Sequence, residues 1–259
     1  MEIQNNISLS EYTTFKIGGL ARYFFVAESS DDLIEAVKFA KSKKLSFYIL
    51  GGGSNVLVSD KGFDGLVIKI LNTRYEIRNT KIMAEAGTNL ETLVAASVKS
   101  GLTGLEWAVG IPGTIGGAVK SQTSAFGCDI LETVKSIKES DGVILSVELE
   151  LKKGVQKKSE QLIQEYLRKK KKTQPLEYAS AGCIFKNPQG QFSGQLIEKC
   201  GLKGKQIGQA MVSKKHANFI VNISNAKAED IVMLIKLIKK SVKEKFNIDL
   251  EEEIQYLGF

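Results

Sequence analysis

Two glycine-rich segments hold the residues whose types and spacing could bind phosphate. The first is Gly51-Gly52-Gly53-Ser54-Asn55-Val56, and the second is Ile111-Pro112-Gly113-Thr114-Ile115-Gly116-Gly117. Successive backbone N–H groups in such turns can surround a diphosphate, and glycine lets a ligand approach because it has no Cβ. Two turns of this kind in one α/β region favour a long cofactor that carries phosphate. The alternatives are an ordinary turn for the first segment and a loop that crosses the core for the second.

The first turn departs from two common nucleotide-binding motifs. No Gly-Lys-Ser or Gly-Lys-Thr follows it, which excludes a Walker loop. The segment Asn55-Val56-Leu57-Val58 favours extended chain over the start of a helix, which excludes the Gly-x-Gly-x-x-Gly fingerprint. From this segment alone, a phosphate-binding site and an ordinary turn are equally good interpretations.

The elements around the turns form an α/β pattern. Residues 22–27 and 47–50 predict two strands, and the second strand leads directly into the first turn. Between them, Ser29 is the predicted N-cap of a helix whose apolar positions are Leu33, Ile34, Val37 and Ala40. A further strand is predicted over 66–70 and a further helix over 89–99. Residues 131–152 predict a hairpin, because alternating apolar residues follow the Asp141-Gly142 pair that favours a type I′ turn.

The composition changes after residue 152, and a second unit follows. Residues 152–172 are lysine-rich and contain a predicted helix, near which we place a domain boundary. Beyond it, strands are predicted over 219–221 and 254–257, with an amphipathic helix over 228–245 capped by Asn225. The buried stripe of that helix is predicted to be Ile231, Leu234, Ile235, Ile238 and Val242. We therefore predict a mixed α+β fold with two domains, residues 1–155 and residues 156–259.

Charge and cysteine content limit the classes of partner. The 259 residues include 36 Lys plus Arg against 29 Asp plus Glu, a net charge of +7 that favours anionic partners or a solvated lysine surface. Only four of the basic residues are arginine, which argues against sequence-specific reading of nucleic acid. The three cysteines predict neither a disulfide framework nor a zinc site. With no signal-type N-terminus and no long apolar run, we expect a cytoplasmic protein without membrane or nucleic-acid partners.

Several motifs in order along the chain resemble the UDP-N-acetylenolpyruvoylglucosamine reductase family. In the first part these are Thr13-Thr14-Phe15-Lys16-Ile17-Gly18-Gly19, the first glycine turn and Gly110–Gly117. In the second part they are Ser180-Ala181-Gly182-Cys183-Ile184-Phe185-Lys186-Asn187-Pro188, Gly201-Leu202-Lys203-Gly204, Lys215-His216-Ala217-Asn218-Phe219 and Leu250-Glu251-Glu252-Glu253-Ile254. The resemblance covers nearly the whole chain, and several motifs in order are more specific than any one of them.

The resemblance implies an FAD-binding domain of the vanillyl-alcohol-oxidase type joined to a smaller α+β substrate-binding domain. FAD would lie with its diphosphate on the two glycine turns and be held non-covalently, because the only histidine, His216, lies in the second unit. NADPH would reduce the flavin, and a hydride would then pass to UDP-N-acetylglucosamine enolpyruvate. The product would be UDP-N-acetylmuramate for peptidoglycan, and the enzyme would act as a monomer.

The resemblance also assigns roles to residues of the second unit. Cys183 matches the proton donor, and a thiol with an unperturbed pKa of about 8.5 is close enough to neutrality for that role. The alternative for Cys183 is a small buried hydrophobe. Glu253 matches the glutamate that stabilises the enol intermediate, with a solvated acidic turn as its alternative. Lys186, Asn187 and His216 are the predicted substrate contacts.

Two departures from the family pattern leave the activity open. The Tyr-Arg segment that supplies a cation to the enol is missing, and Asp141-Gly142 joins the flanking strands directly. Residues 122–127 read QTSAFG where the family reads closer to NAGAYG, near the isoalloxazine. Either a lysine such as Lys186 or Lys120 replaces the arginine, or the chain is a paralogue that binds FAD or a nucleotide sugar without the reductase reaction. A basic nucleic-acid-binding protein is the third hypothesis, and the absence of an interleaved aromatic and basic stripe disfavours it.

Overall fold

The computed structural model describes residues 2–259, which form two compact units that are not consecutive in the chain. The first contains the residues up to Gln4 with Tyr23–Gly52 and Gly65–Lys170, and the second contains Asn5–Arg22, Gly53–Asp64 and Lys171–Phe259. The contacts therefore group two early segments with the C-terminal part. A single domain boundary in the sequence cannot reproduce this grouping. The domain limits 1–155 and 156–259 stay a prediction.

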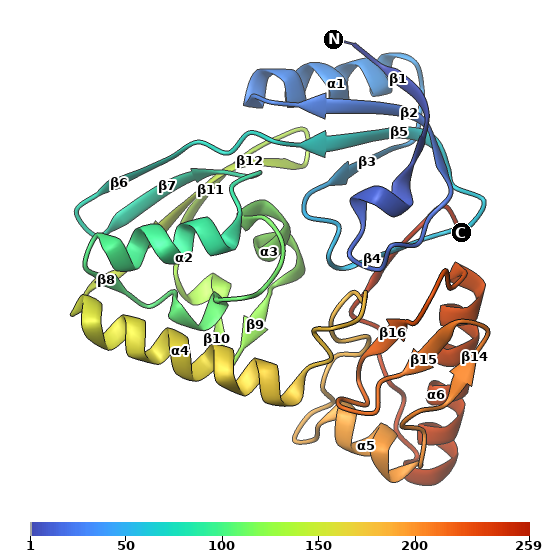
Figure 1. Ribbon diagram of the computed structural model, residues 1–259. Helices are drawn as coiled ribbons and strands as arrows, with labels where there is room; N and C mark the ends of the chain where they lie inside the picture. The colour runs from blue at the N-terminus through green and yellow to red at the C-terminus, as the bar shows by residue number, and fades with distance from the viewer. Residues whose placement is uncertain (1) are drawn as a thin grey trace. The chain divides into compact units, whose positions relative to one another are not determined.

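The predicted strand, helix and strand are β2, α1 and β3, and most of their residues belong to the first unit (Figure 1). A four-stranded sheet has the order β1-β2-β5-β3, and β3 runs parallel to β5 with Leu50 opposite Lys69. Its strands are β1 Gln4–Ser8, β2 Leu20–Ala27, β3 Phe47–Leu50 and β5 Phe63–Ile70. Helix α1, Ser30–Ser42, starts at the predicted cap, where the Ser29 hydroxyl accepts from the Asp32 N–H. The buried positions of α1 are Leu33, Ala36, Val37 and Ala40.

A second sheet of the first unit has the order β11-β12-β7-β6. Its strands are β6 Tyr75–Arg78, β7 Lys81–Glu85, β11 Val134–Ser140 and β12 Val143–Glu150. Asp141 and Gly142, with φ of 56° and 80°, join β11 to β12, so the predicted hairpin and its left-handed turn are confirmed. Helices α2, Leu90–Lys99, and α3, Ile115–Ser121, share a core with this sheet. The predicted helix over 89–99 is thereby confirmed, with Asn89 as its cap.

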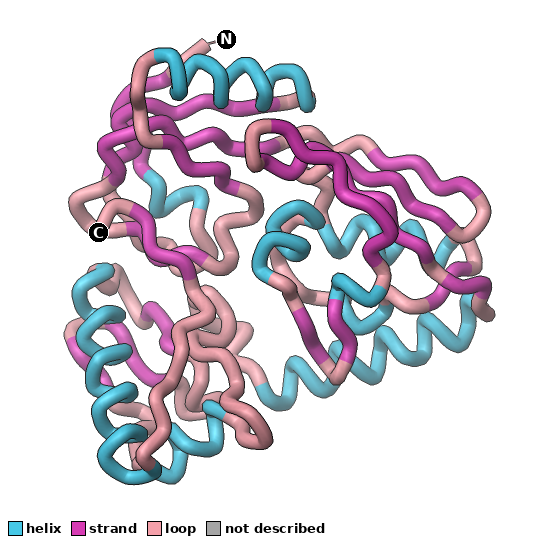
Figure 2. The backbone as a smooth tube through the Cα atoms, turned by 180° about the vertical axis from the view of Figure 1, so that it is seen from behind, coloured by secondary structure: helices cyan, strands magenta, loops and turns pink. Residues whose placement is uncertain are grey.

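Helix α4, Gln156–Thr173, is the long helix that the lysine-rich segment predicts (Figure 2). Its Ile163 and Tyr166 pack against the core of the first unit, while Ser159 and Lys170 are its fully buried residues. The remaining short elements of this region are β8 Leu102–Thr103, η2 Glu106–Ala108, β9 Ser124–Ala125, β10 Cys128–Asp129, η3 Ile130–Glu132 and β13 Lys152–Lys153.

In the second unit, α6 packs against a three-stranded sheet with the order β14-β15-β16. The predicted stripe of α6 is buried as expected. The C-terminal strand β17 pairs in parallel with β4, Gln255 opposite Val56. The elements are η1 Leu9–Tyr12, β4 Val56–Val58, α5 Ser193–Lys199, β14 Gln206–Ile207, β15 Ala210–Val212, β16 Ile220–Asn222, α6 Ala228–Phe246 and β17 Gln255–Leu257.

The prediction that Asn225 caps α6 is wrong. Asn225 has a left-handed φ of 53° and lies before the helix, whose N-cap position is Lys227. The acceptor comes from far away in sequence: the Asp60 carboxylate accepts from the N–H groups of Ala228 at 3.0 Å and Glu229 at 3.3 Å. A negative charge at this end also favours the helix dipole.

Two further expectations concern the chain as a whole. The helices formed by residues 2–259 include none that is both long and apolar enough to cross a membrane. Cys128, Cys183 and Cys200 are free thiols.

Candidate functional site

The two glycine turns meet, backbone against backbone, inside the first unit. A Cβ on Gly52 would lie 2.6 Å from the Cα of Gly113, and a Cβ on Gly51 would lie 2.7 Å from the Thr114 hydroxyl oxygen. Real Cβ atoms do not approach other atoms so closely, so only glycine fits at either position. The sequence prediction that these segments act together is consistent with this contact.

A count of the hydrogen-bond donors shows which N–H groups in the turns could bind phosphate. In the second turn, the N–H groups of Ile115, Gly116 and Gly117 already donate to Thr88, Ala86 and Thr114. This part of the segment begins α3 and is therefore not the open turn that the glycines predict. Among the residues that the structure describes, none accepts from the N–H groups of Gly52, Gly113 or Thr114. These three N–H groups are backbone donors of the two turns that a ligand could use.

The rest of the first turn is held inside the second unit. Gly53 has a φ of +64°, and a Cβ on it would lie 1.9 Å from the Tyr12 carbonyl oxygen. Its own carbonyl accepts from Thr14 at 3.0 Å. The Asn55 amide donates to the Glu253 carbonyl at 3.1 Å, and Val56 is buried in β4. Gly53, Asn55 and Val56 therefore have structural roles beside the predicted cofactor contact.

The structure brings Cys183 and Glu253 together in the second unit. Cys183 lies opposite Phe219, and Phe185 lies opposite Glu252, in isolated antiparallel bridges. The Glu253 N–H donates to the Ile184 carbonyl at 2.8 Å. Two motifs about 70 residues apart in sequence are thus paired along their backbones, and the Glu253 carboxylate is close enough to act electrostatically on the Cys183 thiol.

The surroundings of the thiol change its acidity. Burial raises the pKa of Cys183 to about 12, the Glu253 charge adds to the increase, and a hydrogen bond with Asn218 opposes it. The unperturbed value of about 8.5 therefore does not describe this thiol, because burial disfavours the charged thiolate. Burial also raises the pKa of Glu253, and the Lys186 charge partly lowers it. Cys183 is thus a protonated, neutral thiol at physiological pH.

Asn218 connects this pair to His216, and sequence reasoning assigned it no role. Its side-chain oxygen accepts from the Phe185 N–H at 3.0 Å, and its amide donates to the Phe185 carbonyl at 2.8 Å. The His216 Nδ1 accepts from the Asn218 N–H at 3.3 Å. Burial and the Lys203 charge lower the pKa of His216, so its ring is neutral at pH 7.

The other predicted substrate contacts already have protein partners. The Lys186 ammonium forms an ion pair with Glu251, and the Asn187 side chain accepts from the Ser193 N–H at 3.0 Å, where α5 begins. Lys120, considered as a replacement for the missing arginine, is exposed at the end of α3. These roles stay predictions.

Comparison with known proteins gives matches over almost the whole chain. Residues 21–154 match the FAD binding domain family, and residues 174–257 match the UDP-N-acetylenolpyruvoylglucosamine reductase C-terminal domain family. The UDP-N-acetylenolpyruvoylglucosamine reductase of Clostridium novyi is 39% identical over 99% of this chain and 92% of its own length. That of Caldanaerobacter subterraneus is 38% identical over 98% of this chain and 93% of its own length.

A solved structure is similar throughout. The UDP-N-acetylenolpyruvylglucosamine reductase of Thermus caldophilus has a TM-score of 0.85 and 31% identity, over 99% of both chains. The alignment with the Clostridium novyi protein runs over 285 positions, against the 259 residues of this chain. That relative therefore contains residues that have no counterpart here, as expected if a segment is missing.

Proposed function

Because this chain belongs to the UDP-N-acetylenolpyruvoylglucosamine reductase family, we propose that it reduces UDP-N-acetylglucosamine enolpyruvate to UDP-N-acetylmuramate. FAD would be its bound cofactor and NADPH its reductant. The observation that carries the proposal is the Cys183 thiol, which burial keeps protonated and on which the Glu253 carboxylate acts electrostatically. No match in the comparisons favours the alternative of a paralogue without the reaction.

Within this proposal, the first unit holds the cofactor. The N–H groups of Gly52, Gly113 and Thr114 would bind its diphosphate, since no described protein group accepts from them. The full predicted set is Gly51, Gly52, Gly53, Ser54, Asn55, Val56, Ile111, Pro112, Gly113, Thr114, Gly116 and Gly117. When bound, FAD supplies the redox step, by which a hydride from NADPH reaches the enolpyruvyl double bond.

The second unit supplies the proton. Hydride addition to one carbon of the double bond leaves negative charge on the neighbouring carbon, which must gain a proton. The Cys183 thiol keeps its proton because burial disfavours the thiolate, so Sγ–H is available to that carbon. Glu253 would stabilise the enol intermediate that exists before this proton arrives, and Lys186, Asn187 and His216 would contact the substrate. We further propose that the protein works in the cytoplasm as a monomer.

An anaerobic experiment in two halves tests the function. The purified protein is first treated with NADPH, and loss of the flavin absorbance reports the first half-reaction. UDP-N-acetylglucosamine enolpyruvate is then added without oxygen. Return of the absorbance only upon addition of the sugar supports the reductase. A flavin that is reduced but stays reduced would contradict it, and the search would move to another acceptor.

A further inference from the structure

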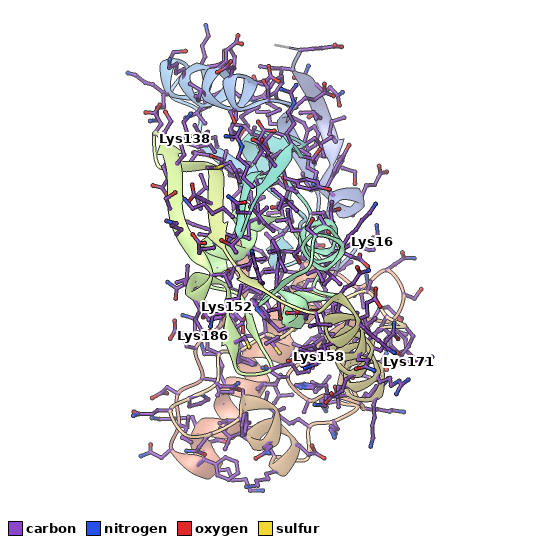
Figure 3. The ribbon with its side chains drawn as sticks, turned by 90° about the vertical axis from the view of Figure 1, so that its left-hand side faces the viewer. Lys16, Lys138, Lys152, Lys158, Lys171 and Lys186 are labelled. Atoms are coloured by element: carbon purple, nitrogen blue, oxygen red, sulfur yellow. The ribbon has the colours of Figure 1, made fainter. Side chains whose placement is uncertain are left out.

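A buried lysine beside the second glycine turn has no acidic partner among residues 2–259. Lys170 is 4% exposed, although its neighbours on α4 lie at the surface, as Lys158 and Lys171 in Figure 3 do. Its ammonium donates to the Val109 carbonyl at 2.6 Å and lies 5.9 Å from the centre of the Phe126 ring. A Cβ on Gly110 would lie 3.9 Å from the same nitrogen. Burial lowers the pKa of Lys170 to about 8.

A second lysine repeats this arrangement at the first turn. Lys69 is on β5 opposite Leu50, so its side chain is level with the end of β3. Its ammonium donates to the carbonyl of Gly51, the first residue of the turn. Lys69 is half-buried, and burial lowers its pKa. Each turn therefore has one lysine whose ammonium donates to a main-chain carbonyl near the beginning of the turn. The carbonyl is that of Gly51 for the first turn and that of Val109, just before the second turn, for the other.

The lack of acidic partners is what needs a physical explanation. No carboxylate within residues 2–259 forms an ion pair with Lys69 or Lys170. Removing an ammonium from water is unfavourable unless an anion offsets the loss. The buried carboxylate of Glu106 accepts three hydrogen bonds, from Ser159, Thr103 and Gly104. The Lys170 ammonium, by contrast, has one hydrogen-bond acceptor among the described residues, the Val109 carbonyl. A purely structural role, in which each lysine only satisfies a carbonyl, would not need a charge.

We propose that Lys69 and Lys170 supply the positive charge that binds the diphosphate of FAD. Both belong to the unit in which the turns meet, and their two charges match the two negative charges of a diphosphate. The backbone N–H groups of Gly52, Gly113 and Thr114 then fix the phosphate oxygens, while the lysines neutralise them. This inference rests on the proposed function for the identity of the cofactor.

Glutamine substitutions separate charge from hydrogen bonding. Lys69→Gln and Lys170→Gln each remove a charge but keep a donor for the carbonyl, and Lys157→Gln removes an exposed charge from α4 as a control. The full-length protein is stripped of flavin, and the Kd of FAD is measured by flavin fluorescence. ADP and adenosine then displace FAD in competition. We expect the Kd values of FAD and ADP to rise about tenfold in each variant, with that of adenosine unchanged.

The outcomes distinguish the possibilities. Equal weakening of ADP and adenosine would mean that the lysines only support the turns, and this would overturn the proposal. So would Kd values equal to those of Lys157→Gln. If Lys170→Gln does not fold, Lys69→Gln decides alone, because its side chain is only half-buried. The binding assay uses neither NADPH nor the sugar, so its result does not depend on the reaction. If FAD binds normally but the anaerobic experiment shows no turnover, only the proposed reaction is overturned. An unmodified protein that binds no FAD would overturn both.

Discussion

At the scale of single residues, the surroundings of Cys183 decide its chemistry more than its residue type does. The family motif located the cysteine, but its raised pKa follows from burial and from the neighbouring Glu253. The motif also did not reveal Asn218, whose side chain fixes the Phe185 backbone next to the thiol. Side-chain identity is readable in sequence, whereas the local polarity depends on which distant segments fold around it.

Substitution of Cys183 should separate the two half-reactions. For Cys183→Ala we expect turnover to fall by roughly 10²–10⁴-fold, the usual contribution of a general acid. The rate of flavin reduction by NADPH should not change, because it does not need this proton. Stopped-flow absorbance measures each half separately. Cys183→Ser is the matched control, and it should retain most of the activity because it keeps an O–H donor. Unchanged turnover in the alanine variant would exclude Cys183 as the donor.

The pH dependence of proton transfer follows from the same environment. A raised pKa means that the protonated form persists as pH rises, until the pH approaches the shifted value of about 12. The rate of flavin reoxidation by the sugar should therefore show no loss around pH 8.5, where an unperturbed thiol ionises. Single-turnover rates of FAD-saturated protein between about pH 6 and 9.5 test this. A fall with an apparent pKa near 8.5, absent from Cys183→Ser, would contradict the assigned environment.

At the scale of elements, α4 is tied to the segment before it by a buried carboxylate. Burial raises the pKa of Glu106, but hydrogen bonds from Ser159, Thr103 and Gly104 outweigh it, so the net pKa is lowered. Ser159→Ala should lower the free energy of unfolding by about 1.5–3 kcal/mol, because a hydrogen bond to a charged group is lost. Urea unfolding measures the change, with exposed Gln164→Ala as control.

The same hydrogen bond has a defined pH dependence. A lowered folded-state pKa stabilises the fold at pH above the unfolded value, and this contribution is lost as pH falls through the folded-state pKa. The stability difference between wild type and Ser159→Ala should therefore shrink in acid. A difference that stays constant from neutral pH to acid would show that packing, and not the Glu106 charge, is responsible.

Capping of α6 provides a second test at this scale. Asp60→Ala should destabilise the protein by about 1 kcal/mol, because two N–H groups at the helix start lose their acceptor. Asp60→Asn keeps a side-chain oxygen and should cost less. Asp64→Ala, which removes a carboxylate that is 83% exposed, serves as the control. Equal stability of Asp60→Ala and Asp64→Ala would rule out the cap.

These elements also show what local pattern can and cannot predict. Periodicity and capping residues predicted α1, α2, α6 and the β11–β12 hairpin, because each depends on residues close in sequence. The cap of α6 escaped prediction since Asp60 is more than 160 residues away. The start of α3 escaped because Gly116 and Gly117 disfavour a helix, which close packing against Ala86 nevertheless imposes.

At the scale of the whole molecule, cofactor binding and stability are linked. A ligand that binds only the folded protein adds about 2.7 kcal/mol at a free concentration of 100 Kd. Flavin-free protein should therefore unfold at lower urea concentration than protein with excess FAD. Circular dichroism during urea titration measures both states. Coincident curves for the two would contradict FAD binding to the native fold.

The grouping of segments is the part of the fold that sequence patterns could not predict. Composition placed a single change near residue 152, while residues 5–22 and 53–64 join the C-terminal part through contacts. Family motifs indicated the cofactor and the paired residues because they record such contacts indirectly. Lys69 and Lys170 escaped notice among 32 lysines, since only burial distinguishes them.

The pairing of β4 with β17 has a consequence for the synthesis of this protein on the ribosome. Residues Val56–Val58 are buried, yet their partner strand Gln255–Leu257 begins 197 residues after Val58 and is translated that much later. At about 5–20 residues per second, the apolar β4 strand waits roughly 10–40 s for its neighbour. During that interval the second unit cannot close, and the nascent chain exposes an unpaired strand edge to the cell's chaperones.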